Sequence, residues 1–186
     1  NSDMATLREL HAAARHLARL LAEQQSGIVF AESCTGGLIS AALTRIPGIS
    51  AYHCGSAVVY QLETKAAWLG ISRKLLKNPG PVSPSVARAM AEGVLERTPR
   101  PERAAWVAGQ LGPDPPAGQD GLVYCAVTRR PAARGRRDFR TAVHRLQLDR
   151  PPRQSSPADL ARLRIRRQTA AAEFVVSRVC DSLRGV

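Results

Sequence analysis

A short apolar run, Gly27-Ile28-Val29-Phe30-Ala31, constrains the fold more than any other feature of the chain. An uninterrupted run of this length indicates a strand that is buried on both faces. The segment before it has an apolar stripe at helical spacing, formed by Leu7, Leu10, Ala14, Leu17, Leu20 and Leu21. A strand buried on both faces needs helices to cover it, so the sequence predicts an α/β fold.

The rest of the chain continues this alternation of strands and helices. Helices are predicted over residues 38–43, 63–69, 83–97 and 157–183, and strands over residues 27–31, 56–60, 104–108, 121–128 and 139–148. Ser83 followed by Pro84 has the pattern of an N-cap and a first helical residue. The last strand is expected to return antiparallel to residues 121–128. The Gly- and Pro-rich loop over residues 109–120 is long enough to be functional.

Composition and length agree with one domain, predicted over residues 5–183. The 186 residues are 44% hydrophobic and only 4% aromatic, which suits helices on a sheet of small branched residues. Residues 1–3 precede the first methionine and are expected to be non-native. The longest apolar run is far shorter than the roughly 20 residues that span a bilayer. A soluble, cytoplasmic protein with no membrane partner is therefore expected.

The net charge of +12 raises the question of a nucleic-acid partner. Residues 1–127 contribute only +2, from 12 Lys and Arg and 10 acidic residues, whereas residues 128–186 contribute +10, from 15 Arg and 5 acidic residues. No aromatic residues alternate with these arginines as a stacking platform requires. We therefore expect a solvated arginine-rich face. Nucleic acid bound by the segment from Arg129 to Arg167 remains a third and weaker hypothesis.

The cysteines and histidines show no metal-binding pattern. The four cysteines lie far apart without a C-x-x-C pair, and no histidine has metal-like spacing to them. Reduced structural thiols, no bound metal and no cofactor are expected. No histidine is an obvious base for a serine nucleophile either, so a Ser-His-Asp triad is unsupported.

The residues most able to carry chemistry follow the first two strands. Ser33 lies where a buried strand gives way to a helix, the place where open α/β sheets bind ligands. Backbone N–H groups of Thr35, Gly36 and Gly37 could hold a phosphate or an oxyanion there. On spacing alone, an ordinary N-cap is the favoured explanation of Ser33, because serine before a helix is common. Lys65, partly desolvated, could act as a general base, with Tyr60 positioning it or relaying a proton.

These residues also form motifs that resemble a known family. Residues 31–37 (AESCTGG), 46–48 (IPG), 60–65 (YQLETK), 69–71 (LGI), 82–83 (VS) and 87–91 (ARAMA) are similar in order and spacing to the C-terminal domain of the CinA proteins. The resemblance implies a three-layer α/β/α sandwich with a mixed, mostly parallel sheet. It implies an amidohydrolase that converts nicotinamide mononucleotide to nicotinate mononucleotide and ammonia, with Ser33 as nucleophile and Lys65 and Tyr60 as its activating partners.

The same resemblance implies a substrate-binding set around this centre. Besides the turn at residues 35–37, it includes Ser83, Gly109 and the helical pair Arg162 and Arg166, which could grip a phosphate. It also implies a nucleotide as the small-molecule partner and a homo-oligomer, and it indicates a stand-alone form of the domain.

Three departures from the family pattern support an alternative. Leu62 stands where the family has asparagine, and Ala108 stands where it has threonine. Glycines after Pro113 are replaced by Asp114 and two prolines, which removes donors and adds a charge that repels phosphate. The alternative is a catalytically impaired paralogue that binds a nucleotide or a protein partner without turnover.

Overall fold

The computed structural model describes residues 2–112, 115–130, 139–149 and 155–185, and it contains one five-stranded sheet. The strand order is β2-β1-β3-β4-β5. β1 pairs in parallel with β2 and β3, whereas β4 is antiparallel to both β3 and β5. Only β4 therefore runs against the other strands, as expected for a mixed, mostly parallel sheet.

The elements follow the predicted alternation. The strands are β1 (Ile28–Glu32), β2 (His53–Val58), β3 (Arg103–Gly109), β4 (Leu122–Arg129) and β5 (Arg140–Gln147). The helices are α1 (Ser2–Gln24), α2 (Leu38–Thr44), α3 (Leu62–Leu69), α4 (Arg73–Lys77), α5 (Pro84–Arg97) and α6 (Pro157–Arg184), with a 3-10 turn at Ile49–Ala51.

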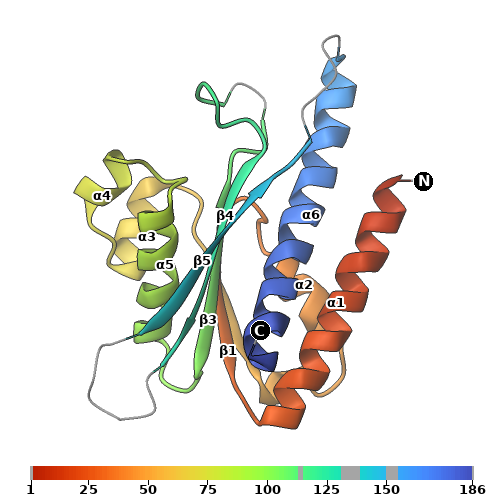
Figure 1. Cartoon of the computed structure of the whole chain (residues 1–186), viewed down its shortest axis with the longest axis vertical. Helices are drawn as coiled ribbons and strands as arrows, with labels where there is room; N and C mark the ends of the chain where they lie inside the picture. Colours follow the sequence, from red (N-terminus) through yellow and green to blue (C-terminus); the bar gives the residue numbers. More distant parts are fainter. Residues whose placement is uncertain (1, 113–114, 131–138, 150–154, 186) are drawn as a thin grey trace.

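Helices cover both faces of the sheet, which confirms the three-layer α/β/α architecture. α1, α2 and α6 lie on one side, and α3, α4 and α5 lie on the other (Figure 1). Each side has its own apolar core. Phe30 and Val107 pack toward α1 and α6, whereas Ala31 and Trp106 pack toward α5. All five residues of β1 are buried, as its apolar run predicts.

Two elements differ from the sequence prediction. β2 runs from His53 to Val58 instead of over residues 56–60, so Tyr60 follows the strand instead of ending it. Its pairing with β1 starts at Ile28 and ends at Glu32, and the shorter partner fixes the length of β2. The short helix α4 was not predicted, because five residues give too little periodicity to recognise.

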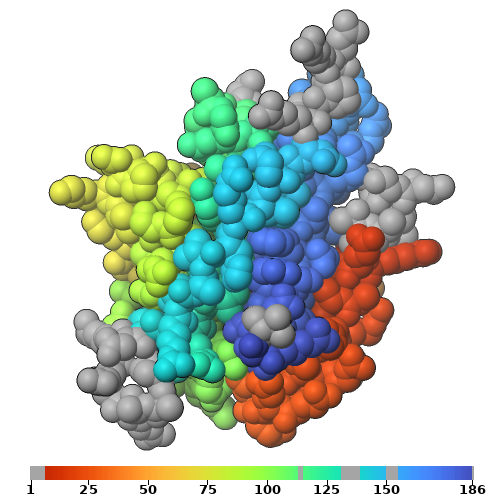
Figure 2. Space-filling model, viewed as in Figure 1, coloured from red at the N-terminus to blue at the C-terminus, as the bar shows by residue number. Residues whose placement is uncertain are grey.

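β5 is an edge strand that stays partly exposed. It crosses the surface between α5 and α6 in Figure 2, and its residues alternate between exposed and half-buried along most of its length. Within the described part of the chain, no helix is both long and apolar enough to cross a bilayer.

Candidate functional site

The turn after β1 is organised by a carboxylate that the sequence prediction overlooked. Glu32 ends β1, is fully buried, and accepts hydrogen bonds at both carboxylate oxygens. Its five donors are Thr35 Oγ1 (2.8 Å), Gly37 N (3.1 Å), Ile39 N (3.2 Å), Ser40 N (3.2 Å) and Ser56 Oγ (2.8 Å). An acid at a helix N-terminus satisfies free N–H groups and the helix dipole. Through these hydrogen bonds, Glu32 holds together the turn, the start of α2 and Ser56 of β2.

Ser33 and Lys65 meet at the carboxyl end of β1. The Ser33 amide donates to Val107 O (3.2 Å) on β3, which holds the serine at the end of the strand. Lys65 Nζ lies 3.1 Å from Ser33 Oγ. The two residues are 32 positions apart, yet they are in direct hydrogen-bond contact and both are buried. This contact is the predicted serine–lysine pair.

The environment of Lys65 weakens the charged form of its amine. Its side chain is 2% exposed, and burial lowers the pKa of Lys65 to about 8. Nζ also donates to Val59 O (2.9 Å) and Tyr60 O (2.7 Å). Nζ donates to Ser33 Oγ as well, so the charged amine has an acceptor for each of its three N–H groups, and loss of one proton leaves a lone pair that can accept the hydroxyl proton of Ser33. A lysine amine with a lowered pKa thus lies within hydrogen-bond distance of a serine hydroxyl.

Tyr60 contributes to this arrangement through its backbone. Its carbonyl holds Lys65, whereas its side chain is 59% exposed and its hydroxyl accepts a hydrogen bond from Arg164 Nη2 (2.7 Å). Positioning of the lysine is therefore a backbone function, and the hydroxyl is directed to α6. His53, in turn, lies within 2.8 Å of Ser40 Oγ rather than beside Ser33.

Several of the turn's predicted ligand donors already have protein acceptors. Gly36 N donates to Ser33 O (3.0 Å), Gly37 N donates to Glu32, and the buried Thr35 hydroxyl also donates to Glu32. Gly36 and Gly37 have φ angles of 62° and 96°, a backbone conformation that favours glycine. The glycines therefore shape the turn. Among the described residues, the amides of Cys34 and Thr35 donate to no backbone acceptor.

An arginine outside the predicted pair, Arg164, contacts residues that follow β2 and β3. Arg162 is exposed and forms an ion pair with Asp159 at 2.8 Å, and Arg166 is half-buried on α6. Arg164 instead donates to Tyr60 Oη and to the Gly112 carbonyl. Its charge also acts to lower the pKa of the Cys34 thiol, although burial dominates and raises that pKa to about 12. Arg164 thus links α6 to Tyr60 after β2 and to Gly112 after β3, and its charge acts on Cys34 in the turn.

Gln168 lies one turn after Arg164 and faces the same way. Its Nε2 donates to Cys34 O (3.1 Å), in the residue after Ser33. Arg164 and Gln168 have i, i+4 spacing, which places them on one helix face. This spacing was available in the sequence, but it fits Arg162 and Arg166 equally well, and only helix packing distinguishes the two faces.

Ser83 and Gly109 have clear structural roles. Ser83 caps α5 by accepting from Val86 N (3.4 Å) and donates to Gly80 O (2.8 Å). A Cβ at Gly109 would lie 2.7 Å from Val123 Cγ2, so the close approach of β3 to β4 requires glycine there. These contacts give both residues a place in the fold, and their predicted part in substrate binding stays a prediction.

The departures from the family pattern surround the same end of the sheet. Leu62 begins α3 at the surface, 37% exposed, and Ala108 is buried in the core below α5. Pro113 and Asp114 lie outside the described residues. The described part of the chain contains no group of three or more His, Cys, Asp or Glu side chains that could hold a metal ion.

These features define an α/β/α protein with a buried serine–lysine pair at the carboxyl end of its central parallel strands. The sequence matches the family described as CinA C-terminal domain over residues 10–156, so the chain belongs to that family. It is 46% identical to the CinA-like protein of Endomicrobium trichonymphae over 95 residues, 51% of this chain and 22% of that protein. The chain therefore covers about a fifth of that relative's length.

Solved structures share the architecture. The competence/damage inducible protein CihA from Agrobacterium tumefaciens has a TM-score of 0.72 and 28% identity, with 91% of this chain and 94% of that chain covered. The competence damage-inducible protein A from Klebsiella pneumoniae has a TM-score of 0.76 and 22% identity, with 94% and 97% covered. The second likeness concerns the fold alone.

Proposed function

We propose that the protein is an amidohydrolase that deamidates nicotinamide mononucleotide to nicotinate mononucleotide and ammonia. The observation that carries the proposal is the buried contact between Lys65 Nζ and Ser33 Oγ at 3.1 Å. A desolvated lysine beside a serine is a known way to activate the hydroxyl as a nucleophile. Family membership agrees with this chemistry, and it adds the pyridine carboxamide as the expected substrate group.

The reaction proceeds in two halves. Lys65 takes the proton of Ser33 as Oγ attacks the carboxamide carbon, and it then gives a proton to the departing nitrogen, so ammonia leaves and an acyl ester on Ser33 remains. Water attacks this ester and loses a proton to Lys65, the acid leaves, and Ser33 regains its hydrogen. The net change is one amide and one water converted to one acid and one ammonia.

The oxyanion of each tetrahedral intermediate needs donors near Ser33. We assign this role to the backbone amides of Cys34 and Thr35, because the amides of Gly36 and Gly37 already have acceptors within the turn. Arg164 supplies a positive charge on the α6 side for the substrate phosphate. A guanidinium suits that role because its planar donors match phosphate oxygens.

The experiment that tests the proposal measures ammonia and nicotinate mononucleotide formed by the purified wild-type protein. We expect both products in equal amounts. An active CinA-family enzyme serves as the positive control in the same assay. If the wild type binds the nucleotide but forms neither product, the impaired paralogue is the correct function, and Leu62 and Ala108 are the first positions to restore to asparagine and threonine.

The activity should depend on pH through Lys65. The neutral amine is the base, and it predominates above the pKa of about 8, so kcat/KM is expected to rise as pH increases through that value. The measurement is a pH–rate profile from pH 6 to 10 with subsaturating substrate. A profile that is flat across this range, or that falls with increasing pH, would contradict the assignment of Lys65 as base.

Arg164 and Arg162 should differ in their effect on substrate binding. Arg164→Gln is expected to raise KM about tenfold, the loss of one charge-assisted phosphate contact, with little change in kcat. Arg162→Gln is the matched control and should leave KM unchanged, since Arg162 pairs with Asp159 at the surface. Comparing nicotinamide mononucleotide with its phosphate-free riboside shows whether the lost contact is to the phosphate. Equal effects of the two substitutions would contradict this placement.

A further inference from the structure

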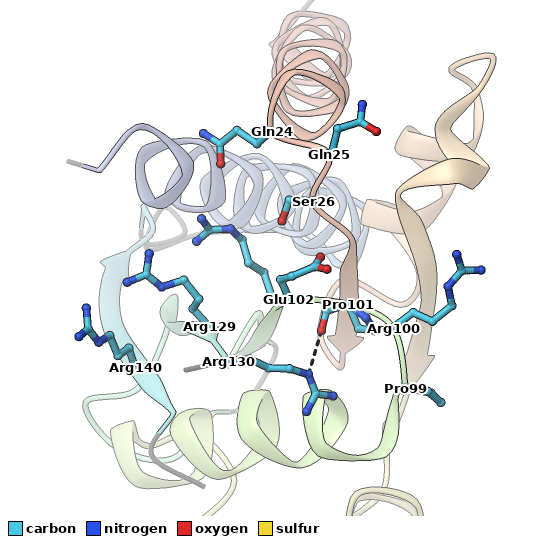
Figure 3. A pocket seen from close by; sticks show the side chains of 11 residues that line it. Gln24, Gln25, Ser26, Pro99, Arg100, Pro101, Glu102, Arg129, Arg130 and Arg140 are labelled. Atoms are coloured by element: carbon cyan, nitrogen blue, oxygen red, sulfur yellow. Dashed lines mark hydrogen bonds between the residues drawn. The ribbon is translucent and has the colours of Figure 1, made fainter. Parts of the chain in front are cut away.

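A polar hollow lies where β3 begins and β4 ends, away from the Ser33 end of these strands. It has a volume of about 730 Å³, within the usual range for small-molecule sites. Its lining is strongly basic and includes Arg100, Arg103, Arg129, Arg130 and Arg140, with Glu102 as the acidic residue (Figure 3). The serine–lysine mechanism uses none of these residues.

Three of the arginines form a ladder across neighbouring strands. Arg103 on β3 pairs with Arg129 on β4, and Arg129 pairs with Arg140 on β5. Residues directly opposite each other in antiparallel strands point to the same face, about 5 Å apart. Like charges at such positions destabilise a sheet. A bound anion would relieve the repulsion among the three arginines of this ladder.

Arg103 is the most constrained member of the arginine ladder. It is 8% exposed, and its Nη1 donates to Ser182 Oγ (3.2 Å) on α6. Its buried Nε has no hydrogen-bond acceptor among the described residues. Burial, and then the charge of Arg129, lower the pKa of Arg103. A buried guanidinium without a carboxylate is costly unless another anion compensates it.

Among the described residues that line this hollow, Glu102 is the acid that acts on Arg103, and it offsets the lowering of the Arg103 pKa only in part. Glu102 accepts from Gly27 N (2.6 Å), and Arg130 turns toward α5, where it donates to Pro101 O (3.0 Å) and Thr98 O (2.7 Å). Figure 3 shows Arg129 and Arg140 lying near one another on a different side from Arg130.

A second hollow continues the basic surface along α6. It has a volume of about 600 Å³ and shares Arg129 and Arg140 with the first. Arg178 also lines it and forms an ion pair with Asp181 at 2.8 Å. Asp181, the acid of this second hollow, is therefore already paired with an arginine. Arg129 and Arg140 line both hollows and so lie between them.

We propose that the arginine ladder binds a small polyphosphate anion. Guanidinium groups bind phosphate oxygens through paired donors, and three of them in register present such donors to successive phosphates of one ligand. No aromatic side chain is among the described residues that line the first hollow, so the platform that single-stranded nucleic acid needs is missing there. The site is separate from the proposed deamidase centre and does not depend on it.

Titration calorimetry with sodium tripolyphosphate, at constant ionic strength, tests the proposal. The wild type should bind at one saturable site. Arg129→Gln and Arg140→Gln should each weaken binding about tenfold or more, because each removes a charge-assisted contact. Arg15→Gln, an exposed arginine on α1, is the matched control and should bind within about twofold of wild type. Tripolyphosphate should also raise the Tm of the wild type more than that of the ladder variants.

Other results would overturn the proposal. The first is equal affinity for tripolyphosphate in the wild type and all three variants, and the second is an absence of saturable binding. The third is binding of a DNA duplex that is lost in the Arg129 and Arg140 variants, without any binding of tripolyphosphate. Stability of the unliganded protein provides an independent check. Arg129→Gln should raise the urea midpoint by relieving repulsion with Arg103 and Arg140, and a lower midpoint would show that these charges are not in conflict.

Discussion

Substitution of either member of the serine–lysine pair is expected to abolish most ammonia release from nicotinamide mononucleotide. Ser33→Ala removes the nucleophile and should lower kcat about a thousandfold or more. Lys65→Met keeps the length and burial of the side chain but removes the base, and should lower kcat about 10²–10⁴-fold. Initial rates at saturating substrate, from a coupled ammonia assay, measure both effects.

Two controls separate chemistry from folding. Lys74→Met removes a lysine charge from the exposed surface of α4 and should leave kcat unchanged. Urea unfolding should show that Ser33→Ala is as stable as the wild type within about 1 kcal/mol. If Lys65→Met is folded and retains more than a tenth of the wild-type kcat, another group is the base and the mechanism is wrong.

Substitution of Glu32 is expected to cause the largest loss of stability. Glu32→Gln keeps the shape of the side chain but replaces one acceptor oxygen with an NH₂ group, which cannot accept from the donors that face it. Hydrogen bonds to a charged group and the cost of unsatisfied buried donors together predict a loss of about 3 kcal/mol or more in the free energy of unfolding. Urea denaturation followed by circular dichroism measures this loss.

The matched control for this prediction is Glu63→Gln, in the exposed first turn of α3. It removes the same charge beside a helix N-terminus but breaks no buried network, so its effect should stay below about 1 kcal/mol. Similar losses for the two variants would mean that the Glu32 contacts contribute little, and that another feature holds the turn after β1.

Local sequence patterns predicted most of the elements because they depend on neighbouring residues. The apolar run in β1 and the cap at Ser83 with Pro84 were predicted from the sequence, and the structure confirms both. The ends of β2 were misplaced because a strand's length depends on its partner. The local sequence pattern alone did not show where the pairing of β2 with β1 begins and ends.

The serine–lysine pair, too, was predicted in part from local sequence and depends in part on tertiary packing. The sequence alone put Ser33 at the end of a strand and Lys65 on the following crossover helix, and the family motifs suggested that the two act together. Only the packing of α3 against α5 brings Nζ within 3.1 Å of Oγ and buries it so that the pKa of Lys65 falls to about 8. Desolvation is a property of the folded surroundings.

Tertiary structure also decided which polar groups face one another. The sequence by itself determined the alternation of strands and helices, the turn after β1 and the arginine-rich last third of the chain. It did not determine that Glu32 accepts hydrogen bonds from α2 and β2, or that Arg164 rather than Arg162 bonds to the Tyr60 hydroxyl. The physical reason is that local structure follows nearest-neighbour preferences, whereas charge pairing and burial depend on helix rotation and strand register, which the whole core fixes at once.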